Sequence, residues 1–119
     1  MEIRERVVGS VTVLDVEGRL VLGEGDKRLR DAVDALVRQG RTRVLLNLAA
    51  VPLVDSAGLG QIVRTHTTLS RVGGRLKLLR ADKRMHDLLS ITKLITVFEL
   101  FDDELEALKD FSQADRGRP

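Results

Sequence analysis

The sequence lacks cysteine, tryptophan and tyrosine, and its 119 residues include only three phenylalanines and two histidines. Without cysteine the chain has no disulfide, no thiol nucleophile and no thiolate ligand for a metal. So few aromatic rings leave almost no stacking platform for nucleic acid, and the basic residues are scattered. Two isolated histidines, with no carboxylates at ligand spacing, also argue against a metal site. We therefore expect no nucleic-acid partner, no metal and no other cofactor.

Long apolar runs are absent as well. No stretch approaches the ~20 apolar residues that cross a bilayer, and residues 1–6 carry charges of both signs with no apolar stretch behind them, unlike a signal peptide. The net charge is only +2, from 20 basic and 18 acidic residues. This composition is typical of a globular domain. We expect one domain over residues 1–111 and a disordered tail over 112–119. We also expect a cytoplasmic location, no membrane partner, and a monomer or weak dimer.

The hydrophobic pattern predicts an α/β fold. Two β-branched runs, 3–8 and 11–16, are separated by Gly9-Ser10 and indicate a hairpin. From Glu24 the apolar period becomes that of an amphipathic helix, which ends before Gly40. The apolar residues of that helix are Leu29, Ala32, Val33, Leu36 and Val37.

Strands and helices continue to alternate after this helix. The apolar run 44–48 predicts a strand that is buried on both faces. It is followed by a helix over 57–72, a strand over 75–79, a short helix capped by Asp82, a strand over 95–98 and a helix from Asp102-Asp103. Such alternation favours parallel strands joined by helical crossovers. We therefore expect a mixed, mostly parallel sheet of four to five strands, packed with about four helices.

Ser56 lies where the exit loop of the central strand becomes a helix. The first amides of a helix lack intrahelical partners, and serine is a preferred N-cap because its oxygen accepts from them. Gly58 and Gly60 each cost the helix up to about 1 kcal/mol relative to alanine. Close packing on a neighbouring strand and access for a partner explain these glycines equally well. Ser56 is either a plain helix cap or a switch, and the two roles are compatible.

Three segments together resemble the STAS domain family, in particular the bacterial anti-sigma-factor antagonists. They are Leu46-Asn47-Leu48, Val54-Asp55-Ser56-Ala57-Gly58-Leu59-Gly60 and Gly73-Gly74-Arg75-Leu76-Lys77-Leu78. The resemblance implies that an anti-sigma factor serine kinase binds the unphosphorylated chain, which frees a sigma factor. It further implies that this kinase phosphorylates Ser56 and ends the binding, and that a phosphatase resets the protein.

The resemblance also implies a set of partner-binding residues. These are Val21, Glu24, Asp55, Ser56, Ala57, Gly58, Leu59 and Gly60. The sequence departs from the family pattern at two of them. Val21 stands where many members have an acidic residue, although Glu24 and Asp26 supply charge close by. Ala57 stands where a second hydroxyl is common, so Ser56 is the only hydroxyl of the loop.

Other classes of function are weaker matches. A hydrolase would use Ser56 as nucleophile, His66 as base and Asp55 as the orienting group. The chain has no Gly-x-Ser-x-Gly elbow, and ten helical residues place His66 roughly 15 Å from Ser56. We therefore expect no enzyme activity. A STAS scaffold that is never phosphorylated stays an alternative, and nucleotide binding is disfavoured because no glycine-rich phosphate loop with lysine is present.

Overall fold

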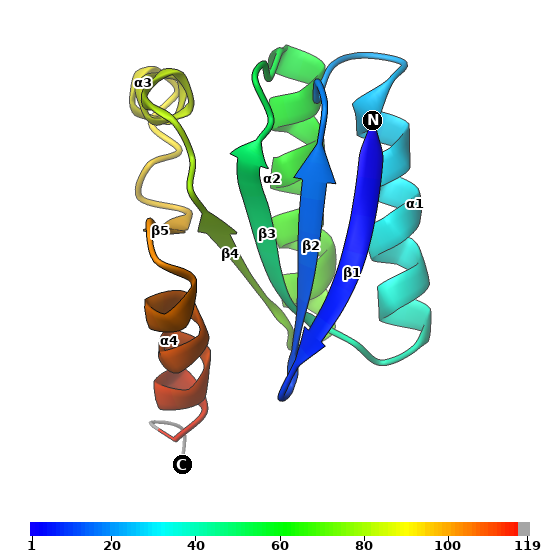
Figure 1. Cartoon of the computed structure of the whole chain (residues 1–119), viewed down its shortest axis with the longest axis vertical. Coiled ribbons are helices and arrows are strands. Elements are labelled where there is room, and N and C mark those ends of the chain that lie inside the picture. The colour runs from blue at the N-terminus through cyan, green and yellow to red at the C-terminus, as the bar shows by residue number, and fades with distance from the viewer. Residues whose placement is uncertain (117–119) are drawn as a thin grey trace.

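The computed structural model describes residues 1–116, which form one sheet flanked by helices (Figure 1). The elements are β1 (Glu2–Val8), β2 (Val11–Glu17), α1 (Gly25–Arg38), β3 (Arg43–Ala50), α2 (Ser56–Arg71), β4 (Arg75–Leu79), α3 (Lys83–Ile91), β5 (Glu99–Phe101) and α4 (Glu104–Arg116). The strand order is β1-β2-β3-β4-β5, antiparallel in the first pair and parallel in the others. The predicted α/β class and mixed sheet are confirmed.

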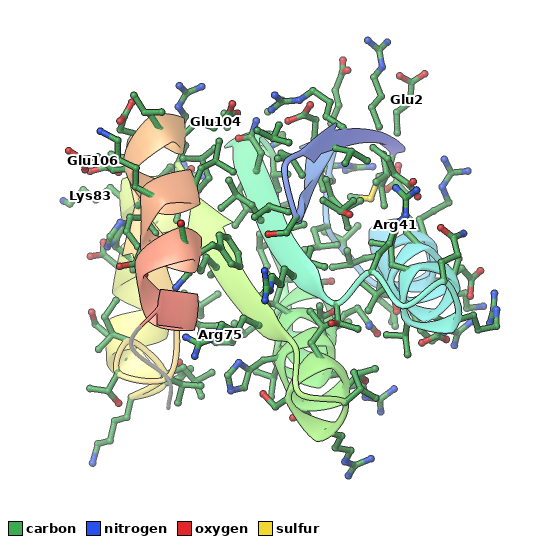
Figure 2. All side chains as sticks on the ribbon, turned by 90° about the horizontal axis from the view of Figure 1, so that it is seen from below. Glu2, Arg41, Arg75, Lys83, Glu104 and Glu106 are labelled. Atoms are coloured by element: carbon green, nitrogen blue, oxygen red, sulfur yellow. The ribbon has the colours of Figure 1, made fainter. Side chains whose placement is uncertain are left out.

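Helices cover both faces of the central strands. Figure 2 places α4 on one side of β3 and β4 and places α1 and α2 on the other. Neighbouring residues of β3 point to opposite faces, as in any strand. Val44 and Leu46 join the larger core beneath α1, α2 and α3, whereas Leu45 packs with Phe111 of α4. The prediction that the central strand is buried on both faces is thereby confirmed.

Local sequence signals determine the hairpin and the first helix. Gly9 has φ +60° in the turn of the β1–β2 hairpin, a conformation that glycine adopts without strain. Helix α1 buries Leu29, Val33 and Leu36 along one stripe, as its period predicts. Gly40 has φ +73° just after the end of α1. These local predictions are all confirmed.

The last strand lies later in the chain than the sequence pattern predicts. Residues 95–97 form a turn and not a strand, and β5 comprises Glu99–Phe101. The amides of Leu94 and Ile95 both donate to the Leu89 carbonyl, at 2.8 and 3.1 Å, which folds this segment back over the end of α3. Phe98 belongs to the core and is only 5% exposed, and Ile95 packs against that core, whereas Val97 is 43% exposed.

Helix α4 is held against the sheet by two ion clusters. Arg6 of β1 bonds to Asp15 of β2 and to Glu104 of α4, each at 2.6 Å. Lys77 of β4 has a fully buried side chain, and its Nζ lies 2.6 Å from Asp110 of α4. Hydrogen bonding to Lys77 lowers the pKa of Asp110. These contacts fix α4 to the face opposite α1 and α2.

The C-terminal boundary also differs from the sequence-based one. Helix α4 continues to Arg116, five residues beyond the predicted end of the domain at residue 111. The final residues of the predicted tail, 117–119, lie outside the described part of the chain. Within residues 1–116, no helix is both long enough and apolar enough to span a membrane.

Candidate functional site

The segments that follow β2 and β3 run side by side at one edge of the sheet. Leu20 donates its amide to the Leu53 carbonyl at 2.9 Å and accepts from the Asp55 amide at 3.3 Å. A parallel bridge between Leu20 and Val54 completes this contact. This single bridge extends the sheet locally. The start of α2 is therefore anchored to the loop that precedes α1.

Asp55, and not Ser56, is the N-cap of α2. Its Oδ1 accepts from the Gly58 amide at 2.8 Å, which satisfies one of the unpaired donors at the start of the helix. Its Oδ2 accepts from the Leu22 amide at 3.0 Å. Hydrogen bonds from these two amides, first from Leu22 and then from Gly58, lower the pKa of Asp55. One carboxylate thus caps a helix and ties it to a neighbouring loop.

Ser56 is the first residue of α2 and is exposed. With Asp55 as the cap, the Ser56 hydroxyl is not needed to complete the helix. No hydrogen bond joins that hydroxyl to any other described residue. The role of plain helix cap is therefore filled by a neighbour, and Ser56 presents a free hydroxyl to an approaching molecule.

The two glycines of the first turn have different surroundings. A Cβ atom on Gly58 would overlap the Leu20 carbonyl oxygen, so the close approach of α2 to the Leu20 backbone requires glycine there. A Cβ atom on Gly60 would meet no heavy atom within 4 Å. Packing accounts for Gly58, whereas Gly60 leaves open surface beside Ser56.

The other predicted partner-binding residues differ in exposure. Ala57 and Val21 are half-buried, and Leu59 is a core residue that is 7% exposed. The Val21 carbonyl accepts from the amides of the turn that leads into α1. Glu24 is exposed and lies 3.3 Å from Arg19. Of the predicted set, Glu24, Ser56 and Gly60 therefore offer the most accessible surface.

An apolar cavity that the sequence does not predict lies beside this loop. The cavity measures about 180 Å³ and lies between residues 51–54 and the start of α3. Its lining includes Pro52, Leu53, Met85, Leu88 and Arg84. Leu53 is 43% exposed. No periodic pattern signals this cavity, because it forms only when two segments far apart in the sequence pack together.

The hydrolase arrangement is not assembled. The Asp55 carboxylate is occupied by two backbone amides, and His66 packs edge-on against Phe98 with ring centroids 5.5 Å apart. The buried Nδ1 of His66 has no hydrogen-bond partner. His66 is half-buried and lies at the border of the core. Among the described residues, no group of three or more acidic or histidine side chains is placed to hold a metal.

Comparison with known proteins identifies the family. The model of the STAS domain matches residues 2–107. The chain belongs to the STAS domain family. A STAS-domain relative, the homologue of TM1081 in Thermotoga neapolitana, is named as a candidate anti-sigma factor antagonist. It is 30% identical over 105 residues, which make up 88% of this chain and 93% of that protein.

Solved STAS structures share the fold. The corresponding protein of Thermotoga maritima superposes with a TM-score of 0.84 at 24% identity and covers 91% of this chain and 92% of its own. The phosphorylated form of the Bacillus cell fate determinant SpoIIAA superposes with a TM-score of 0.74 at 21% identity, with 92% and 99% coverage. At these identities the likeness supports the fold alone.

Proposed function

We propose that this STAS domain is an anti-sigma-factor antagonist that acts by partner switching in the cytoplasm. The unphosphorylated chain binds an anti-sigma factor serine kinase and so releases a sigma factor. Phosphorylation of Ser56 ends that binding, and a phosphatase restores it. The observation that carries the proposal is the free, exposed Ser56 hydroxyl at the start of α2. The name of the Thermotoga neapolitana relative supports it.

The surroundings of Ser56 suit a protein interface. Leu22 is 74% exposed and belongs to the loop whose backbone is hydrogen-bonded to Asp55. Leu53 is 43% exposed and lines the apolar cavity. A partner side chain in that cavity would bury apolar area close to Ser56. Side chains that become buried in well-packed pockets on binding often contribute most of the binding energy of an interface.

A phosphate on Ser56 would act directly on such an interface. It adds about −1.5 to −2 charges and three strong acceptors. Burying an unpaired charge costs several kcal/mol, and about 1.4 kcal/mol already changes an affinity tenfold. The adjacent Asp55 carboxylate adds further repulsion toward an acidic surface. Binding and phosphorylation therefore exclude one another without a change of fold.

The proposal is tested by incubating the protein with ATP and each anti-sigma factor kinase encoded by the same genome, and then measuring its intact mass. We expect one added phosphate that Ser56→Ala abolishes and that the matched variant Ser70→Ala, at another exposed serine of α2, retains. Ser56→Asp should lose affinity for the kinase. If no kinase phosphorylates the chain, the alternative of a STAS scaffold that is never phosphorylated is favoured.

A further inference from the structure

The outer groove between α1 and α2 is basic. It has a volume of about 350 Å³ and is lined by Arg30 of α1 and by Arg64 and Arg71 of α2, with Asp34 as its one acidic residue. Among the described residues, Arg64 and Arg71 have no carboxylate partner. Arg30 makes only a 3.4 Å contact with its neighbour in sequence, Asp31. The groove therefore carries positive charge that the fold does not neutralise.

This groove is continuous with the Ser56 site along the surface of α2. Ser56, Gly60, Arg64, Thr67 and Arg71 are all exposed and follow one another at intervals of three or four residues. Residues at this spacing lie on one face of a helix. The stripe is about 22 Å long at 1.5 Å per residue. A protein that covers Ser56 and extends along α2 would meet the arginines next.

We propose that the groove formed by Arg30, Arg64 and Arg71 docks an acidic segment of the anti-sigma factor. This inference rests on the function proposed above and adds the chemistry of the partner surface. Three arginines face Asp34 in the groove and Asp31 beside Arg30, and this excess of positive charge favours an anionic partner. No aromatic side chain lines the groove, so the stacking that single-stranded nucleic acid uses is absent. An acidic protein segment fits these features better than a nucleic acid.

The groove and the switch should act independently. Arg64 lies eight residues along α2 from Ser56, about 12 Å at 1.5 Å per residue. That distance exceeds the Debye length of about 8 Å at physiological ionic strength. A phosphate on Ser56 therefore interacts only weakly with Arg64 and Arg71, and changes at the two places should add in their effects on binding free energy.

The test reverses charge in the groove with the double variant Arg64→Glu/Arg71→Glu. The matched control Arg41→Glu/Lys109→Glu changes the net charge equally at exposed positions outside the groove. Binding to each anti-sigma factor encoded by the same genome is measured by calorimetry at about 50 and 250 mM NaCl, which are below and above the physiological ionic strength. Circular dichroism checks that all variants fold.

We expect the groove variant to bind the anti-sigma factor roughly tenfold more weakly at low salt and to lose most of the salt dependence, while the control stays within about twofold. Wild-type affinity in the groove variant, with binding still lost in Ser56→Asp, overturns this inference and leaves the proposed function intact. Failure of the wild type to bind any anti-sigma factor overturns both. If the groove variant loses affinity for a single-stranded oligonucleotide that the wild type binds, while its affinity for the anti-sigma factor is unchanged, the groove binds nucleic acid and the inference is also overturned.

Discussion

Gly58 and Gly60 allow the same substitution to be compared in two different environments. A methyl group on Gly58 would overlap the Leu20 carbonyl oxygen and lie 2.8 Å from the carbonyl carbon. The same group on Gly60 would meet no heavy atom within 4 Å. Alanine favours a helix over glycine by about 1 kcal/mol at both positions. The variants Gly58→Ala and Gly60→Ala therefore share the gain in propensity and differ in the clash.

The clash should outweigh the gain at Gly58. Relieving it requires α2 to move away from Leu20, which lengthens the hydrogen bond from the Asp55 amide to the Leu20 carbonyl. Overpacking costs about 1–3 kcal/mol, and a weakened hydrogen bond adds about 1 kcal/mol. After the propensity gain, Gly58→Ala should lower the free energy of unfolding by about 1–3 kcal/mol. Gly60→Ala should raise it by up to about 1 kcal/mol.

Thermal and urea unfolding, followed by circular dichroism, measure both changes. The entropy of unfolding of 119 residues is about 0.25 kcal/mol/K, so the expected shifts in Tm are a fall of about 4–12 °C for Gly58→Ala and a rise of up to about 4 °C for Gly60→Ala. Equal shifts of the same sign would refute the packing explanation. If the partner covers the open surface at Gly60, Gly60→Ala should also weaken binding while the fold becomes more stable.

Substitutions of Asp55 and Lys77 and a fall in pH test the contacts that hold the helices to the sheet. Asp55→Ala removes the acceptor of two backbone amides and should lower the urea midpoint and speed hydrogen exchange at those amides. Lys77→Ala should lower the free energy of unfolding by about 2–4 kcal/mol in urea titrations, and Lys77→Met by less because its chain still fills the space. The pKa values of Asp110 and of the carboxylates bound to Arg6 are lowered, so the folded state binds protons less readily than the unfolded one. Their contribution should be complete above about pH 5 and be lost as the pH falls below about 4, which urea titrations across this range would detect.

Features encoded over short distances could be predicted from the sequence. The hairpin depends on Gly9-Ser10 between two β-branched runs, and the extent of α1 follows from a 3.6-residue period with a glycine after its end. The sequence predicts that Asp82 caps α3, and its carboxylate accepts from the Met85 amide at 2.9 Å. Each of these features depends on residues that are close to one another in the sequence, so the local pattern is sufficient.

Features that depend on tertiary contacts could not be predicted in this way. The run 95–98 has the composition of a strand, but the end of α3 folds it back, so that Phe98 enters the core and Ile95 packs against that core. Lys77 looks like an ordinary strand lysine, yet its side chain is fully buried because α4 supplies Asp110 against it. Asp55 is the cap partly because the Leu22 amide, 33 residues earlier, engages its second oxygen. Neither the periodicity nor the motif contains these long-range partners.

Phosphorylation of Ser56 should alter binding and leave stability nearly unchanged. The hydroxyl makes no hydrogen bond to another described residue, so its modification breaks none. A negative charge at the N-terminus of a helix is favourable by about 0.3–1 kcal/mol, and repulsion from the adjacent Asp55, which water screens, opposes that gain. We expect the urea-derived free energy of unfolding of the phosphorylated protein to stay within about 1 kcal/mol of the unmodified value. Its affinity for the kinase should fall more than tenfold, because the interface would have to desolvate the phosphate. A large loss of stability on phosphorylation, with both Asp55 hydrogen bonds broken, would instead mean that the switch works by disrupting the start of α2.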